Sequence, residues 1–187
     1  MSSSRDKFYK YKKIINLLIK IDAFLPNVIN RRLLILFRGK SGLIGVGIRY
    51  VLLKNLAKSC GDNVAILEDV IFDAVHLMTF GNNVSINPYC YIAGEINFGN
   101  DISIANHTSF HSFNHTYLNK EIPIKNQPTI NNPIEVNDNV WVGSGCRILS
   151  GVKIGKRAII AAGAVVHKSV LSNTIVAGVP AKSIKKI

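Results

Sequence analysis

A period of six residues in the apolar pattern is the feature that most limits the fold of this chain. An apolar residue followed by a small or polar one returns at every sixth position from Phe80, and after an interruption the same spacing resumes at Val136. The two series are Phe80, Ile86, Ile92, Phe98, Ile104 and Phe110, and then Val136, Val142, Ile148, Ile154, Ile160 and Val166. A weaker series, Cys60, Ile66 and Phe72, precedes them. A repeat of six residues predicts a parallel β-helix, in which each unit supplies a short strand and a corner.

The corners of such a helix carry their own signal. Three six-residue sides make a coil of 18 residues, so turn residues are expected at one corner at that spacing. They occur at Gly61-Asp62-Asn63, Gly81-Asn82-Asn83, Gly99-Asn100-Asp101, Asn137-Asp138-Asn139 and Gly155-Lys156-Arg157. Gly, Asn and Asp tolerate the positive φ that a tight corner requires. We therefore predict a mainly β domain of about five coils over residues 60–187.

Residues 1–59 form a different segment, basic and helical. Helices are predicted over residues 8–24, 27–37 and 45–58, because each stretch ends at Pro or Gly. The segment holds 13 Lys+Arg and 2 Asp+Glu, whereas residues 60–187 hold 10 and 9. Positive charge confined to one third of the chain argues against nucleic acid as a partner of the whole fold. The segment is either a solvated helical face packed on its neighbours or an amphipathic surface at an anionic membrane.

The cellular setting follows from what the sequence lacks. No uncharged apolar run reaches the roughly 18 to 20 residues that span a bilayer, and the N-terminus shows no apolar stretch followed by a cleavage site. We therefore expect an unprocessed cytoplasmic protein, with peripheral contact at the inner face of the membrane if residues 1–59 bind lipid. The three cysteines, Cys60, Cys90 and Cys146, are far apart and fall on inward positions, so we expect reduced, buried thiols.

The six-residue pattern lapses over residues 112–135, a polar stretch with three prolines. A coil cannot absorb so many residues, so this segment is predicted to project as a loop, and loops on rigid scaffolds commonly carry function. His107, His111 and His115 gather at its start. Histidine, whose ordinary pKa is near neutral, is the natural general base for removing a proton from a hydroxyl or amine.

Four segments together resemble a known family. They are His111-Ser112-Phe113-Asn114-His115, Asn139-Val140-Trp141-Val142-Gly143-Ser144-Gly145, Ile160-Ala161-Ala162-Gly163-Ala164-Val165-Val166 and Ala177-Gly178-Val179-Pro180-Ala181-Lys182. Over residues 60–187 the chain resembles the hexapeptide-repeat (left-handed β-helix) acyltransferases, in particular the saccharide O-acetyltransferases of the maltose, galactoside and lipopolysaccharide type. The resemblance implies a left-handed parallel β-helix, acetyl-CoA as acyl donor, no metal, and a homotrimer with active sites between subunits.

The resemblance also implies roles for individual residues. His115 would be the catalytic base, with His111 as the second candidate for that role; Asn87 and His111 would contact the acceptor. Coenzyme contacts would come from Trp141, Ser144, Ala162, Gly163, Lys168, Lys182 and Lys185. The chain departs from the family at Gln127, near which many relatives carry a glutamate, and at His167, where a threonine is common. Each of these residues could instead have a purely structural role. It could turn a corner, allow tight packing between coils or be a solvated surface lysine.

The function implied is an acetyl-CoA-dependent O-acetyltransferase acting on a sugar hydroxyl, in surface polysaccharide, lipopolysaccharide or capsule biosynthesis. An N-acetyltransferase of an amino sugar or antibiotic would use nearly the same residues. A β-helical scaffold without catalysis is the non-enzymatic alternative. A γ-type carbonic anhydrase with zinc on His107, His111 and His115 is disfavoured, because a spacing of four on a six-residue coil points the three side chains in different directions.

Overall fold

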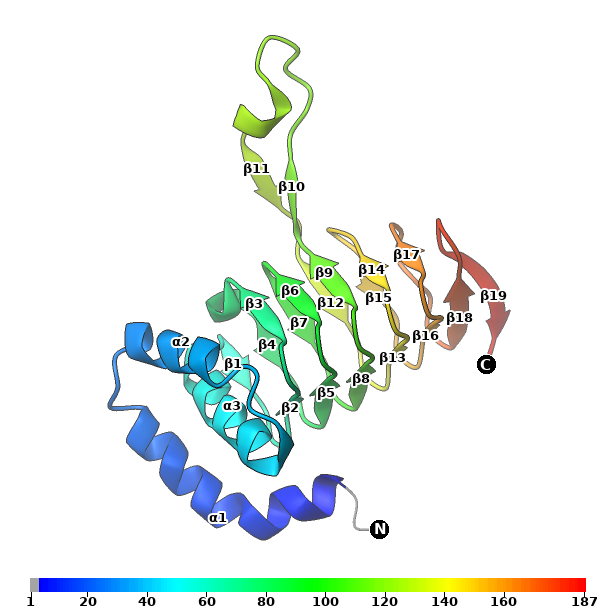
Figure 1. The fold of residues 1–187 in the computed structure, drawn as a ribbon. Coiled ribbons are helices and arrows are strands. Elements are labelled where there is room, and N and C mark those ends of the chain that lie inside the picture. Colours follow the sequence, from blue (N-terminus) through cyan, green and yellow to red (C-terminus); the bar gives the residue numbers. More distant parts are fainter. Residues whose placement is uncertain (1–3) are drawn as a thin grey trace.

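The computed structural model describes residues 4–187, with side chains from residue 8 onward. Three helices, α1 (Ser4–Asp22), α2 (Asn27–Leu36) and α3 (Gly42–Leu56), pack at one end of a three-sided stack of short parallel strands (Figure 1). The three helices and the parallel β-helix predicted from the sequence are confirmed, with helix ends that differ by a few residues. The first three residues of the predicted basic segment lie outside the described residues. In residues 4–187, no helix combines the length and the apolar character needed to cross a membrane.

The stack has three sheets, here called A, B and C. Sheet A contains β1 (Ser59–Cys60), β4 (Thr79–Phe80), β7 (Ile96–Phe98), β12 (Ile134–Val136) and β15 (Lys153–Ile154). Sheet B contains β2 (Ala65–Ile66), β5 (Val84–Ile86), β8 (Ile102–Ile104), β13 (Trp141–Val142), β16 (Ile159–Ile160), β18 (Thr174–Ala177) and β19 (Lys182–Lys186). Sheet C contains β3 (Ile71–Asp73), β6 (Tyr91–Ala93), β9 (Ser109–His111), β14 (Arg147–Ile148) and β17 (Val165–Val166).

The strand counts refine the predicted number of coils. Sheets A and C have five strands each, as about five coils require. Sheet B has seven, because the chain continues past the fifth coil into β18 and then turns back as β19, which pairs with β18 in the antiparallel direction. The stack is thus longer on sheet B than the sequence predicted.

The core runs along the axis of the stack. Every member of the two six-residue series is buried, from Phe80 at 3% exposure to Val166 at 1%. The residues four positions after the members are buried as well, except Asn114, which follows Phe110 and lies on the hairpin. Phe80 stacks on Phe98 of the next coil with ring centroids 5.3 Å apart, and Phe98 contacts Phe110 of its own coil at 5.5 Å. Thr108 is the polar member of this core, and its hydroxyl donates to the carbonyl of Gly143 at 2.9 Å.

Amide side chains stabilise the corner between sheets A and B. The third residue of each predicted turn triplet has positive φ, including Arg157, for which the triplet has no Asn or Asp. The side-chain oxygen of Asn100 accepts the backbone N–H of Asn82 at 2.8 Å, and that of Asp138 accepts the N–H of Asn100 at 2.7 Å. This backbone hydrogen bond from Asn100 is the main reason that the pKa of Asp138 lies below its ordinary value. The corner is therefore a hydrogen-bonded ladder that joins successive coils.

A buried arginine joins the helices to the first coil. The Arg49 guanidinium donates to the carbonyl of Ile66 at 2.8 Å, and to the carbonyls of Phe37, Arg38 and Lys40 at 3.0, 3.1 and 2.7 Å. These acceptors follow the end of α2, where helix carbonyls lack partners. One side chain of α3 thus holds α2 and β2 in place.

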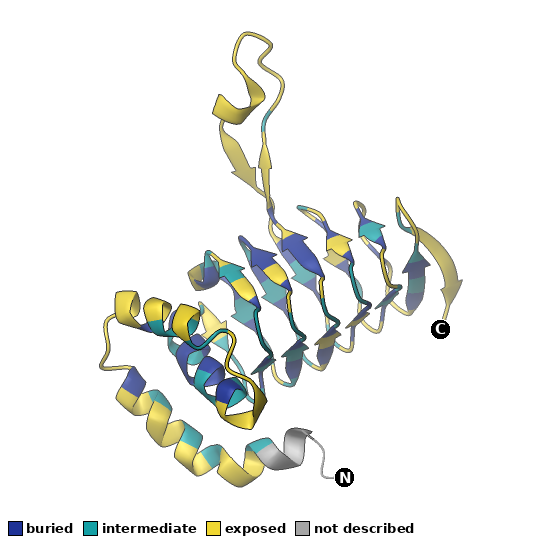
Figure 2. Cartoon of the chain, viewed as in Figure 1, coloured by how far each residue is buried: buried dark blue, intermediate teal, exposed yellow. Residues whose placement is uncertain are grey.

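A hairpin of β10 (Phe113–His115) and β11 (Thr129–Asn131) leaves the stack between β9 and β12 (Figure 1). Almost all of it is exposed, in contrast to the strands below it (Figure 2). Its base is anchored by the buried Ser112, whose hydroxyl lies 2.5 Å from Asn131 Oδ1 and accepts the N–H of Glu95 at 2.8 Å. The predicted projecting loop is confirmed.

The close stacking of the corners predicts a sharp effect of added volume. A Cβ at Gly81 would clash with the backbone carbonyl group of Gly99 in the next coil, so Gly81→Ala should destabilise the protein by about 1–3 kcal/mol. Gly47→Ala is the matched control, because a Cβ there meets nothing within 4 Å in the middle of α3. Urea denaturation should show a lower midpoint for Gly81→Ala and an unchanged or higher one for Gly47→Ala. Equal midpoints would contradict the stacking described here.

Candidate active site

The corner between sheets B and C brings together several residues that the sequence singled out. Ser144 follows β13 and precedes β14, while Ala162 and Gly163 occupy the same place one coil later. Asn87 lies on this corner three coils before Gly163. Trp141 stands beside the corner on sheet B, with 55% of its surface exposed. We call this edge of the stack the B–C corner.

Polar contacts along the B–C corner tie adjacent coils together. The Ser144 hydroxyl donates to Asn106 Oδ1 at 2.7 Å, and the Ser144 carbonyl accepts the N–H of Gly163 at 2.8 Å. Asn87 Nδ2 donates to the carbonyl of Ile104 at 2.9 Å. Both side chains therefore have a structural role, and Ser144 must break its bond to Asn106 before it donates to an oxyanion.

The small residues of this corner serve two purposes. A Cβ on Gly143 would lie 2.6 Å from the backbone nitrogen of Ala162, so Gly143 is required for coil packing. Gly145 and Gly163 have positive φ, and a Cβ on either would meet no other atom within 4 Å. The surface of the corner is therefore open over two successive coils.

His115 lies on the projecting hairpin, in β10, with its ring exposed. Its Nδ1 atom is 3.4 Å from the carbonyl oxygen of Gln127. A carbonyl oxygen only accepts hydrogen bonds, so this contact favours the tautomer with the proton on Nδ1 and a free lone pair on Nε2. That tautomer is the one able to accept a proton at Nε2.

Gln127 is the one buried side chain of residues 113–131, at 5% exposure. Its Nε2 donates to the carbonyls of Asn119 and Ile122 at 2.8 and 2.9 Å, and its Oε1 accepts the N–H of Asn119 at 3.3 Å. The Gln127 side chain therefore holds the hairpin together from inside, while the backbone carbonyl of Gln127 faces His115. The sequence marked Gln127 only as a departure from a family pattern.

His111 ends β9 on the outer face of sheet C. Its ring stacks on Tyr91 with centroids 5.5 Å apart and an interplanar angle of 22°. Desolvation, and next the positive charge of Arg147, lower the pKa of His111. Arg147 was not singled out from the sequence, and its guanidinium donates to the carbonyl of His107 at 2.8 Å. From the sequence alone, Arg147 could be recognised only as an outward-facing residue of a strand.

The three clustered histidines do not converge. His107 lies on the B–C corner and stacks on Tyr89 at a centroid distance of 5.1 Å, whereas His111 and His115 lie on sheet C and on the hairpin. Among the residues that the structure describes, no group of three His, Cys, Asp or Glu side chains is placed to hold a metal ion.

The cysteines are free thiols, and burial makes them poor nucleophiles. Burial raises the pKa of Cys60 to about 12 and that of Cys90 to about 11. Cys90 and Cys146 are fully enclosed in the core, as predicted, while Cys60 is partly buried.

The lysines predicted to contact coenzyme phosphates lie in two places. Lys182 and Lys185 are on β19 at the far end of sheet B, paired opposite Ala177 and Ile175. Lys168 follows β17 and therefore lies on the corner between sheets C and A. All three are exposed.

Sheet C separates the two halves of the candidate site within one chain. His115 and the hairpin leave the stack where sheet C meets sheet A, whereas Ser144, Ala162 and Gly163 lie where sheet C meets sheet B. The fold therefore gathers the corner residues and isolates the histidine.

Comparisons with known proteins agree with this geometry. The family model described as bacterial transferase hexapeptide (six repeats) matches residues 133–168. The galactoside O-acetyltransferase of Escherichia coli is 30% identical over 141 residues, which cover 74% of this chain and 68% of that protein. The E. coli protein named "Putative lipopolysaccharide biosynthesis O-acetyl transferase WbbJ" is 32% identical over 117 residues, 57% of this chain and 59% of that protein.

Solved structures are similar along most of the chain. A galactoside acetyltransferase in complex with coenzyme A has a TM-score of 0.77 and 28% identity, and the match covers 86% of this chain and 80% of that one. A hexapeptide-repeat acetyltransferase from Vibrio cholerae, complexed with acetyl coenzyme A, has a TM-score of 0.75 and 26% identity, and the match covers 84% of each chain.

The extent of the sequence matches varies. The chain spans 45%, 28% and 59% of the lengths of an acetyltransferase-like protein from fission yeast, one from budding yeast and the WbbJ protein, respectively. The galactoside O-acetyltransferase match exceeds two thirds of that protein. From the coils, the small-residue corner and this match, the chain belongs to the hexapeptide-repeat acyltransferase family.

Proposed function

We propose that this protein is an acetyl-CoA-dependent O-acetyltransferase that acts on a sugar hydroxyl, with His115 as the general base. The observation that carries the proposal is the placement of His115 on a rigidly anchored hairpin, with Nδ1 directed at the Gln127 carbonyl. This arrangement leaves Nε2 free to accept a proton. His111 is the weaker candidate, because desolvation and Arg147 hold down its pKa and its ring stacks on Tyr91.

The proposed reaction is a direct transfer. His115 Nε2 accepts the proton of the acceptor hydroxyl as the hydroxyl oxygen bonds to the thioester carbonyl carbon of acetyl-CoA. The tetrahedral intermediate collapses as the carbon–sulfur bond breaks, and the departing thiolate takes the proton from His115. The products are an acetyl ester and coenzyme A, and no acyl-enzyme forms.

Coenzyme A is proposed to lie along the B–C corner. The open surface over Gly145 and Gly163 has room for the pantetheine arm, and the exposed Trp141 offers an aromatic face beside it. Lys182 and Lys185 lie at the end of sheet B, the sheet that carries Trp141, and their positive charge suits phosphate groups. The similar structures with bound coenzyme A and acetyl coenzyme A support a coenzyme site on this fold.

A homotrimer with active sites between subunits is the proposed assembly. Sheet C lies between His115 and the B–C corner in one chain, so a site needs the hairpin of one subunit over the corner of the next. Exposed apolar side chains on the hairpin, among them Tyr117, Leu118 and Ile124, favour docking on a neighbour. Lys168, on the hairpin side, would then reach the coenzyme of the adjacent subunit.

The proposed acceptor is a sugar or glycan, in polysaccharide or lipopolysaccharide biosynthesis in the cytoplasm. The names of the galactoside O-acetyltransferase and of the lipopolysaccharide biosynthesis relative support this class. N-acetylation is the second candidate, because a tetrahydropyridine-dicarboxylate N-acetyltransferase of Staphylococcus aureus is 47% identical over 60 residues, 32% of this chain and 25% of that protein.

Replacing the proposed base should affect the chemical step. We expect His115→Ala to lower kcat by about two to four orders of magnitude while the Kd for acetyl-CoA stays within about twofold, because the residue acts in the transition state. Steady-state kinetics and calorimetric titration measure the two quantities. His76→Ala is the control, since His76 contacts Arg31 at the helical end of the molecule. Unchanged kcat in His115→Ala would refute the assignment.

Subunit mixing tests whether the site is shared. His115→Ala removes the base, and Ala162→Trp should block the corner without disturbing the core, because Ala162 is exposed. Random trimers made by denaturing and refolding an equal mixture should regain about a quarter of wild-type activity, because a site then forms from one intact hairpin and one intact corner. A site contained in one chain would give no recovery.

The type of acylation can be read from the product. An acetyl ester on a sugar hydroxyl is cleaved by hydroxylamine at mildly alkaline pH, whereas an acetamide is stable. We expect label from [14C]acetyl-CoA to be transferred to galactosides, maltosides or oligosaccharide acceptors and to be released by hydroxylamine. Hydroxylamine-resistant label on amino sugars would favour the N-acetyltransferase instead.

A further inference from the structure

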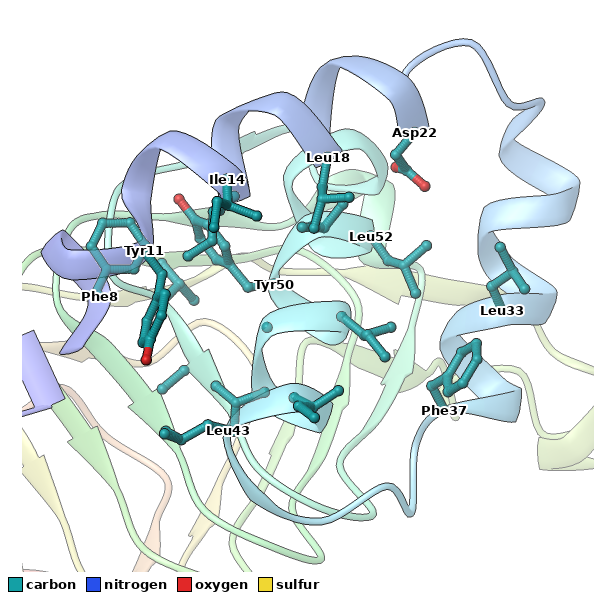
Figure 3. Close-up of a pocket in the computed structure, with 18 of the residues that line it drawn as sticks. Phe8, Tyr11, Ile14, Leu18, Asp22, Leu33, Phe37, Leu43, Tyr50 and Leu52 are labelled. Atoms are coloured by element: carbon teal, nitrogen blue, oxygen red, sulfur yellow. The ribbon is translucent and has the colours of Figure 1, made fainter.

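The three helices leave an open apolar groove between them. It has a volume of about 760 Å³ and lies between α1, α2 and α3, above the start of β2. Figure 3 shows Tyr11, Ile14 and Leu18 of α1 directed toward α3, with Leu43 on the opposite side. Leu33 of α2 and Phe37, which follows α2, close one end. Asp22 is the one carboxylate among the lining residues.

No side chain among residues 8–187 fills the groove. Phe8, Ile15 and Ile19 are the residues of α1 that pack against the core. The stripe beside them lines the groove yet remains exposed, with Ile14 at 60% and Ile21 at 56%. Leu43 and Ile44 at the start of α3 are 62% and 71% exposed. A contiguous apolar surface of this kind on a folded protein marks a binding site.

The charges that the helices carry around the groove are almost all positive. Exposed cations on the helices and their connections are Lys10, Lys13, Lys20, Arg31, Arg32 and Lys40. Between residues 8 and 58, where side chains are described, the single carboxylate is Asp22. It is buried and accepts hydrogen bonds from Asn30 and Asn55 at 3.2 and 2.6 Å. Lys12 and Arg38 form ion pairs with Asp62 and Asp69 of the first coil, at 2.6 and 3.6 Å. The exposed surface of the helices in that range therefore combines hydrocarbon with an excess of positive charge.

We propose that the face formed by α1, α2 and α3 docks on an anionic lipid bilayer. The acyl region contacts the groove and the exposed stripe of α1, and the phosphate groups of the lipids contact the surrounding lysines and arginines. Binding to a bilayer uses both the apolar surface and the positive charge of this face, since interfacial binding scales with apolar contact and with attraction to anionic headgroups. The sequence left a packed, solvated helical face as the alternative; the open groove argues against that alternative.

A second copy of the chain fits this face poorly. Two such faces in contact would oppose cation to cation, because residues 1–59 carry 13 basic and 2 acidic residues. The hairpin and the B–C corner, proposed for the trimer, lie on the β-helix and not on this face. An acidic protein would match the charge, and the experiment below separates it from lipid by using vesicles alone.

Vesicle binding tests the proposal with the full chain and without acetyl-CoA or acceptor, so its result is independent of the proposed activity. Purified protein is floated with vesicles of phosphatidylcholine alone and of phosphatidylcholine with phosphatidylglycerol in a 3:1 ratio. We expect at least about tenfold stronger partitioning to the anionic vesicles, and loss of that difference as salt is raised.

Two variants address the two features of the face. Leu43→Glu combined with Ile44→Glu adds charge to the groove in the first turn of α3, where carboxylates favour the helix. Its control is Leu171→Glu, because Leu171 is 73% exposed at the other end of the stack. Lys10→Gln, Lys13→Gln and Lys20→Gln together remove cations from α1; the control removes Lys120, Lys125 and Lys156 in the same way, all exposed and outside the helices.

Both helix variants should bind anionic vesicles at least about tenfold more weakly, with both controls near wild type. The circular dichroism spectrum and the fluorescence of the single tryptophan, Trp141, report that the variants are folded. Equal binding to the two kinds of vesicle would overturn the proposal. So would equal losses in the helix variants and their controls, or no vesicle binding together with a change of oligomeric state in the Leu43/Ile44 variant.

Discussion

Hydrogen bonding between successive coils is the constraint on which the structure depends. Most strands have only two or three residues, so none is stable alone, and each obtains its backbone partners from the coil before and the coil after. Strict stacking is maintained by side chains that also pair from coil to coil, such as Asn82 with Asn100. Residues in excess of a coil can leave the stack only at a corner. The extra residues before β4 do so as a 3₁₀ turn at Val75–Leu77.

The large insertion follows the same rule and creates the candidate site. Ile96 and Ile134 are neighbours in sheet A although they are 38 residues apart, because the hairpin departs and returns at one corner. Ser112 fixes its base and Gln127 its interior, so His115 is held by a short, bonded hairpin rather than by a loose loop. The periodic stack supplies the other half of the site, since the same corner position recurs as Ser144 and Ala162. A rigid scaffold with one insertion thus holds the proposed base and the proposed coenzyme edge on different sides of a sheet.

The helical segment buries less of its apolar surface than the coils do. It is tied to the β-helix through Arg49 and through a few apolar residues, and it keeps much of its apolar surface exposed. The coils, by contrast, bury nearly every inward side chain. Net positive charge and exposed apolar side chains are denser on the helices than on the coils. The helices therefore suit the proposed contact with an anionic lipid surface, and the β-helix suits the proposed contacts with coenzyme A and a second subunit.

The sequence by itself determined the coils, because a six-residue period, inward apolar residues and Asn or Gly corners act between neighbours in a repeating unit. It also predicted the three helices and the projecting loop, whose prolines and polar residues cannot enter a coil. The sequence missed the seven-stranded sheet B, the buried Gln127, Arg147 beside His111, and the second series of positive-φ corners that includes Tyr89 and His107. Only the tertiary structure decided that Ser144, Ala162 and Gly163 share one corner apart from His115, and that the helices leave their groove open. Those facts depend on which corner an insertion leaves from and on how distant helices pack, which a local pattern does not encode.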